Sequence, residues 1–102
     1  MYLIQLFLPL YDNQGRAFEP GPFAQTRDEL LQRFSGLTQF SRAPVKGIWE
    51  PKDDQPVRDD LVIYEVMADQ LDRAWWLQFR LCLEQRFRQE RILIRAESVE
   101  LL

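Results

Sequence analysis

One carboxylate stands out in this chain because it interrupts a segment that is otherwise apolar. Glu65 is the only charged residue between Leu61 and Ala68, and its neighbours are mostly aliphatic. A carboxylate in such surroundings needs a hydrogen-bonding or cationic partner, and Arg95 and Arg42 are the candidate cations. With such a partner, Glu65 could serve as an acid or base or anchor a ligand, and Arg95 could contact an anion.

Most other catalytic and metal-binding sites are excluded by composition. The chain has no histidine, one cysteine and four glycines that are spread along its length. Ser-His-Asp triads, Cys-His dyads and the common zinc sites therefore cannot be built, and no glycine-rich phosphate loop is present. Two acidic pairs, Asp53–Asp54 and Asp59–Asp60, lack the alternating spacing of a calcium loop and are typical of a hydrophilic turn. We expect no cofactor and no bound metal.

The charge and hydropathy of the chain narrow the classes of partner. The net charge is -3, whereas nucleic-acid binding needs a basic surface, so we expect no nucleic-acid partner. No stretch reaches the roughly 20 apolar residues of a membrane span, so we expect no membrane partner. The apolar N-terminal segment lacks a basic leader and therefore indicates a strand rather than a signal peptide. Cys82, the single cysteine, is expected to be a small core residue in a cytoplasmic protein.

Hydrophobic periodicity predicts which elements position these residues. The segments with strand-like alternation are 2–8, 37–43, 61–68 and 91–99, with a short extra strand near residues 45–50. The segments with helical spacing are 23–34 and a second one that begins after Asp69 or Asp72 and continues to about residue 89. The first helix carries an apolar stripe of Phe23, Leu30, Leu31 and Phe34, and the second a stripe of Trp76, Phe79, Leu83 and Phe87.

This order of elements predicts an α+β fold in a single domain that spans residues 1–102. Each helix joins two strands by a right-handed crossover, which places both helices on one face of a four-stranded antiparallel sheet. The expected architecture is therefore a ferredoxin-like βαββαβ sandwich with the spatial strand order 4-1-3-2.

Residue parity predicts a polar row on the sheet face that the helices leave open. The wholly aliphatic sets of the first and last strands should face the helices. The open face then carries one polar residue per strand, in the order Arg95, Gln5, Glu65 and Gln39, with Trp49 at its rim. A face with so many apolar neighbours is rarely left bare on a monomer, and pairing with a second copy is the simplest cover. We therefore expect a homodimer.

Several runs also resemble a family of small bacterial proteins of unknown function. They are Phe34-Ser-Gly-Leu-Thr38, Gly47-Ile-Trp49, Val57-Arg-Asp-Asp60 and Phe87-Arg-Gln-Glu-Arg-Ile-Leu93. The resemblance covers most of the chain after residue 30 and implies the same α+β fold. It implies no activity, cofactor or site residue.

Two functions of different classes remain open. The first is a non-catalytic binding or interaction module that pairs through its open sheet face. The second is a small cofactor-independent enzyme of the dimeric α+β barrel kind, in which Glu65 is the acid or base for a small organic molecule and the connection 10–22 forms a lid. A cavity that reaches Glu65 is the feature that distinguishes the second function from the first.

Overall fold

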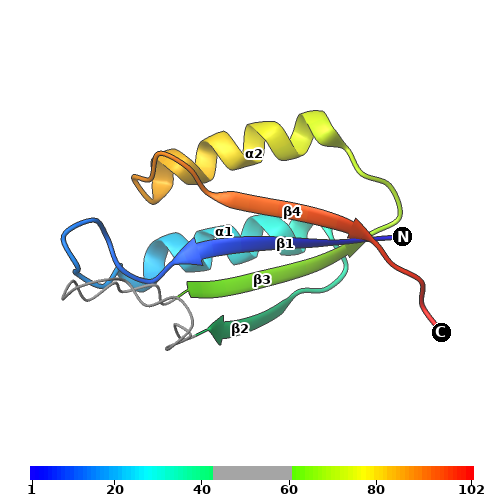
Figure 1. Cartoon of the computed structure of the whole chain (residues 1–102), viewed down its shortest axis with the longest axis horizontal. Coiled ribbons are helices and arrows are strands. Elements are labelled where there is room, and N and C mark those ends of the chain that lie inside the picture. The colour runs from blue at the N-terminus through cyan, green and yellow to red at the C-terminus, as the bar shows by residue number, and fades with distance from the viewer. Residues whose placement is uncertain (43–60) are drawn as a thin grey trace, which may run out of the picture.

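The computed structural model describes residues 1–42 and 61–102, and for residues 40–42 the backbone alone. The short strand predicted near residues 45–50 therefore lies outside the described residues, and so does Trp49. In chain order the elements are β1 (Tyr2–Pro9), α1 (Pro20–Arg33), β2 (Thr38–Arg42), β3 (Leu61–Ala68), α2 (Arg73–Arg86) and β4 (Leu93–Ser98) (Figure 1).

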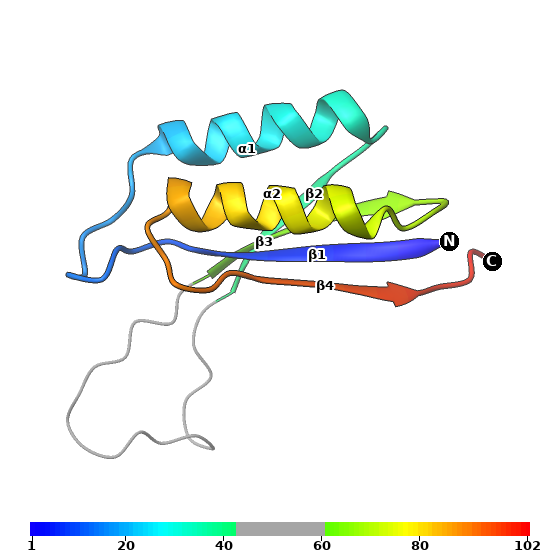
Figure 2. The same ribbon diagram turned by 90° about the horizontal axis from the view of Figure 1, so that it is seen from above.

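The four strands form one antiparallel sheet in the order β2-β3-β1-β4, which is the predicted order counted from the other edge. Both helices lie on the same side of this sheet, next to each other, when the molecule is seen from above (Figure 2). The chain therefore has the predicted ferredoxin-like α+β architecture. The opposite sheet face is covered by neither helix.

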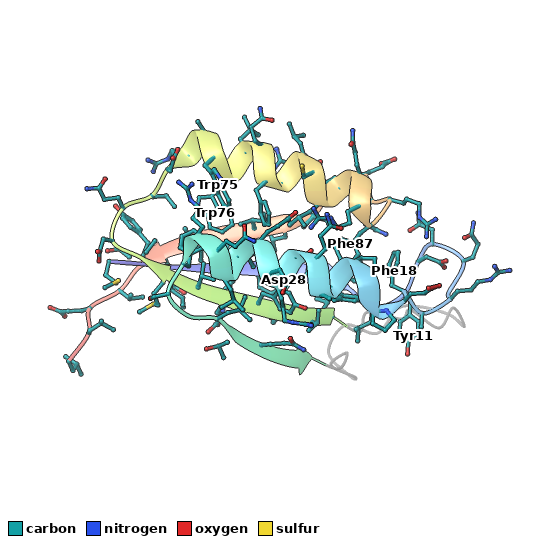
Figure 3. The ribbon with its side chains drawn as sticks, turned by 180° about the vertical axis from the view of Figure 1, so that it is seen from behind. Tyr11, Phe18, Asp28, Trp75, Trp76 and Phe87 are labelled. Atoms are coloured by element: carbon teal, nitrogen blue, oxygen red, sulfur yellow. The ribbon has the colours of Figure 1, made fainter. Side chains whose placement is uncertain are left out.

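The core lies between the sheet and the two helices. The strand residues that face the helices are buried as predicted, namely Ile4, Leu6, Leu8, Val62, Tyr64 and Val66, and so is Ile92 just before β4. All four predicted residues of the α2 stripe, Trp76, Phe79, Leu83 and Phe87, are also buried. Figure 3 shows Trp75 and Trp76 at one end of α2 and Phe87 beside Phe18 at the other.

Two predicted core residues are instead on the surface. Leu31 is 50% exposed, although its neighbour Leu30 is fully buried. Cys82 is exposed, whereas the adjacent Leu83 is fully buried. Consecutive residues of a helix point about 100° apart, so a narrow buried stripe takes one member of each pair and leaves the other in solvent.

The ends of α2 are fixed by local hydrogen bonds. Asp72 is its N-cap, because its carboxylate accepts a hydrogen bond from the backbone N–H of Trp75 at 3.1 Å. The helix ends at Arg86, earlier than predicted, because Arg88 adopts a left-handed φ of 52° and the N–H of Gln89 donates back to the carbonyl of Glu84.

The connection between β1 and α1 is closed on itself. The N–H of Phe18 donates to the carbonyl of Leu10 at 3.0 Å, and Tyr11 and Ala17 form an antiparallel bridge. At its tip, the carboxylate of Asp12 accepts hydrogen bonds from the backbone N–H groups of Gln14 and Arg16, and these bonds hold the pKa of Asp12 below its usual value. These contacts fold the segment into a small hairpin.

Candidate functional site

The predicted polar row exists on the open sheet face as a chain of hydrogen bonds across three strands. In the register, Gln5 of β1 lies directly opposite Glu65 of β3 on one side and Arg95 of β4 on the other. The Arg95 Nε donates to Gln5 Oε1 at 2.8 Å, and Gln5 Nε2 donates to Glu65 Oε2 at 2.5 Å. The row therefore links a cation to an anion through one amide.

The two hydrogen bonds of the row fix the orientation of the Gln5 amide between the two charged side chains. The Gln5 amide presents its oxygen to the guanidinium and its nitrogen to the carboxylate, which is the orientation that satisfies both charges. Gln5 and Glu65 are half-buried, while Arg95 is exposed and lies over the Phe7 ring with 5.3 Å between its guanidinium carbon and the ring centroid. The positive end of the row is thus open to solvent and the negative end is half-buried.

The fourth member of the row was assigned wrongly from the sequence. Thr38, rather than Gln39, lies opposite Glu65, and Gln39 lies opposite Tyr64. Because directly opposed residues share a sheet face, Gln39 belongs to the helix side, where Tyr64 is fully buried. Burial raises the pKa of the Tyr64 phenol, so its hydroxyl stays neutral at ordinary pH.

The two remaining candidates lie at or beyond the limit of the described chain. Arg42 ends β2, with its backbone opposite Leu61, and its side chain lies outside the described residues. Trp49 lies outside them altogether. The described site therefore consists of Gln5, Glu65 and Arg95.

Apolar side chains flank the row on both sides, and the exposed Glu97 of β4, opposite Leu3, shares this face. Leu93 is 56% exposed and Met67 is 37% exposed, whereas Leu3 and Phe7 of β1 are half-buried. Ile63 shares this face by parity and is only 3% exposed. The exposed apolar area of the face thus lies on β4 and at the end of β3.

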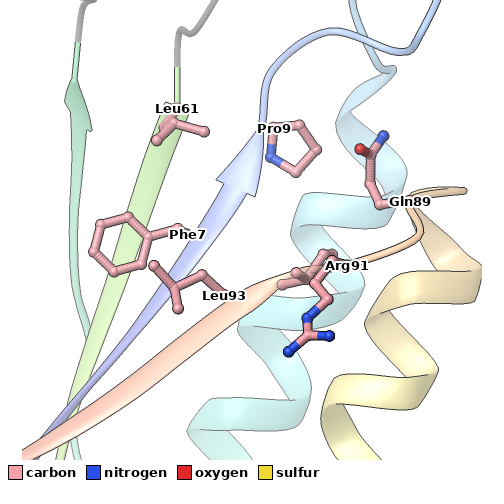
Figure 4. Close-up of a pocket in the computed structure, with 7 residues that line it drawn as sticks. Phe7, Pro9, Leu61, Gln89, Arg91 and Leu93 are labelled. Carbon is pink, nitrogen blue, oxygen red and sulfur yellow. The ribbon is translucent and has the colours of Figure 1, made fainter.

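A shallow pocket of about 260 Å³ opens at one end of this face (Figure 4). Its lining residues are Phe7, Pro9, Leu61, Gln89, Arg91, Ile92 and Leu93. Pockets that enclose small ligands are usually larger, in the range of roughly 300–1,000 Å³. The pocket shares Phe7 with the surroundings of the row, but Glu65 is not part of its lining.

The three described side chains of the row hold one another in place. The Glu65 carboxylate already accepts a hydrogen bond from Gln5, and Gln5 is held in turn by Arg95. Sequence reasoning identified these three residues but not Thr38, and it did not single out Phe7 as the ring beneath Arg95. Within residues 1–42 and 61–102, no three His, Cys, Asp or Glu side chains are grouped so that they could hold a metal ion.

Comparison with known proteins gives no relative for this chain: no family model, no curated protein and no solved structure matches it. Neither helix of the described residues is long and apolar enough to cross a membrane.

Proposed function

We propose that this protein is a non-catalytic, homodimeric interaction module that pairs with a second copy through its open sheet face. The observation that carries the proposal is the polar row itself. Its cation and its carboxylate are each hydrogen-bonded to the amide between them, and the apolar Leu93 and Met67 on the same face are exposed. A row of this kind suits an interface, because each charged group already has a hydrogen-bond partner when the face is buried.

The two-fold pairing of such a face has a simple geometry. Each sheet packs on its copy, so Leu93 and Met67 of both copies become buried, and the rows fix the relative register of the two sheets. The proposal places the module in the cytoplasm, where an exposed thiol such as that of Cys82 stays reduced.

The alternative, an enzyme that uses Glu65 as acid or base, is less well supported. Glu65 does not line the pocket at the end of the open face, and its carboxylate accepts a hydrogen bond from Gln5. A catalytic base must reach the proton that it abstracts, directly or through one water.

Light scattering of purified variants tests the proposal. We expect a dimer at micromolar concentration for the wild-type protein and a monomer for Leu93→Glu and Met67→Glu, because each places a charge in the apolar contact and weakens association about tenfold or more. Leu31→Glu is the matched control, since the exposure of Leu31 lies between those of Met67 and Leu93 but Leu31 is on α1, on the helix side of the sheet. A monomeric wild-type protein, or dissociation by Leu31→Glu alone, would overturn the proposal.

A further inference from the structure

The strand β4 ends the sheet, and its outer edge carries backbone groups that point away from β1. The N–H of Val99 donates to the carbonyl of Met1 at 2.9 Å, and these two residues lie directly opposite each other when the β1–β4 register is extended by one residue. Because hydrogen-bonded and non-bonded pairs alternate along an antiparallel ladder, the odd-numbered residues of β4 bond to β1. Ile94, Ala96 and Ser98 therefore direct their N–H and C=O groups outward.

One end of this edge is already closed by a side chain of α2. The N–H of Ile92, which also points outward by the same alternation, donates to Glu84 Oε2 at 3.0 Å. Glu84 is held in place by Arg80, whose Nη1 lies 2.8 Å from the same carboxylate oxygen. The chain thus satisfies the first outward N–H itself, and the free edge begins two residues later, at Ile94.

A groove of about 260 Å³ runs between this free edge and α2. Apolar residues form most of it, among them Trp76 and the 48% exposed Leu77 of α2, facing Ile94 and Ala96 of β4. The charged residues of its lining are Arg73, Arg80 and Arg95, of which Arg95 directs its guanidinium to Gln5 on the open face; no acidic residue of the described chain lines the groove. In Figure 1, α2 runs above β4 at the margin of the sheet, so the groove is bounded by a helix on one side and a strand edge on the other.

We propose that this groove binds an extended, acidic segment of a partner protein, which adds to β4 as a fifth strand. Backbone hydrogen bonds to Ile94, Ala96 and Ser98 supply binding that does not depend on sequence, and side chains that point toward α2 supply specificity. Alternate acidic residues of the segment face Arg73 and Arg80, and the residues between them lie beside Leu93 on the open face.

The charge of the groove selects this occupant over a second copy of the chain. Two copies joined edge to edge would bring one arginine-lined groove against another, with the same sign of charge on both sides. An acidic segment meets the arginines with opposite charge, even though the chain as a whole is negative. Arg73 is available for this contact, because it has no hydrogen bond or ion pair within the described residues.

The test uses two capped hexapeptides, one of alternating valine and glutamate and one of alternating valine and lysine. Their β-propensity and length are matched, and only the charge differs. Amide hydrogen exchange of the ¹⁵N-labelled protein, followed by NMR, reports on the backbone contact. We expect the valine–glutamate peptide to slow exchange at Ile94, Ala96 and Ser98, and to leave Arg95 and Glu97, which already bond to β1, largely unchanged.

Charge reversal at Arg73 distinguishes recognition of the peptide in the groove from a general effect of the protein's net charge. Arg73→Glu should weaken binding of the valine–glutamate peptide about fivefold or more, which exceeds the loss of one exposed ion pair because attraction becomes repulsion. Arg16→Glu, with the same change in net charge in the exposed turn after β1, should leave the affinity unchanged. Arg73 lacks a partner in the described chain, so its replacement should leave the fold intact.

Three results would overturn the inference. They are equal binding of the valine–lysine peptide, no added protection at Ala96 when the valine–glutamate peptide binds, and protection of Ala96 that rises with protein concentration in the absence of peptide. The last result would assign the edge to a second copy. None of them depends on the open sheet face, so the inference can fail while the proposed dimer stands.

Discussion

At the scale of single residues, the row Arg95–Gln5–Glu65 depends on the amide at its centre. Among the described residues, Gln5 is the one that touches both charges, so Gln5→Leu removes both hydrogen bonds and leaves the half-buried carboxylate of Glu65 without them. We expect Gln5→Leu to lower the free energy of unfolding by about 1 kcal/mol or somewhat more, measured by urea denaturation.

The double variant Gln5→Leu/Glu65→Leu is the informative control. Replacing both partners by apolar groups removes the stranded carboxylate, and the exposed Arg95 can return to water at little cost, so most of the lost stability should be regained. A double variant that is less stable than Gln5→Leu would show that Glu65 stabilises the fold by more than the free-energy cost of burying its carboxylate.

The same row shows how far residue parity predicts a site. Parity assigned Gln5, Glu65 and Arg95 to one face, because their strands have a clear aliphatic set on the other side. It failed for β2, where Thr38, Gln39 and Ser41 give no continuous apolar set to mark the helix side. An edge strand with polar residues at successive positions does not fix its own register from sequence, so Thr38 took the position that was assigned to Gln39.

At the scale of elements, the start of α2 is fixed by Asp72. Its Oδ1 accepts the N–H of Trp75, and its Oδ2 lies 3.2 Å from the guanidinium of Arg33 in an exposed ion pair. Asp72→Ala should lower the free energy of unfolding by about 1 kcal/mol, mostly through loss of the cap, since exposed ion pairs contribute little.

Asp69 provides the comparison, because the sequence offered it equally as the cap. Asp69→Ala should leave the urea midpoint nearly unchanged, and Asp72→Asn should retain most of the stability since asparagine also caps helices well. Equal losses from Asp69→Ala and Asp72→Ala would mean that the cap geometry does not determine where the helix starts.

The helices were predicted well where a stripe was strictly periodic and poorly where two apolar residues are adjacent. In α2, the spacing of 3, 4 and 4 from Trp76 to Phe87 identified the buried side without error. Leu31 and Cys82 each follow or precede a leucine that is fully buried, and sequence alone does not say which member of such a pair faces the core. That choice depends on how the helix is rotated against the sheet, which is settled by packing.

At the scale of the whole molecule, the two proposed surfaces use different parts of one sheet and different forces. The open face carries the exposed Leu93 and Met67 beside a row with one cation and one anion, whereas the groove beside β4 combines a backbone edge with Arg73 and Arg80. Stacking two sheets face to face leaves their outer edges accessible, so the dimer and the added strand can coexist. One molecule can therefore pair with itself through one surface and hold an acidic partner through the other.

Salt concentration distinguishes the electrostatic contribution to peptide binding from the apolar contribution to dimerisation. Raising sodium chloride from about 0.05 M to about 1 M shortens the Debye length from more than 10 Å to about 3 Å, which screens exposed charges but not apolar burial. We expect the affinity for the valine–glutamate peptide to fall about fivefold or more, while the dimer dissociation constant from analytical ultracentrifugation stays within about twofold or decreases. If high salt dissociates the dimer instead, the pairing of the two copies must depend on the charges of Arg95 and Glu65 reaching across the interface, and the picture of an internally satisfied row inside an apolar contact would be wrong.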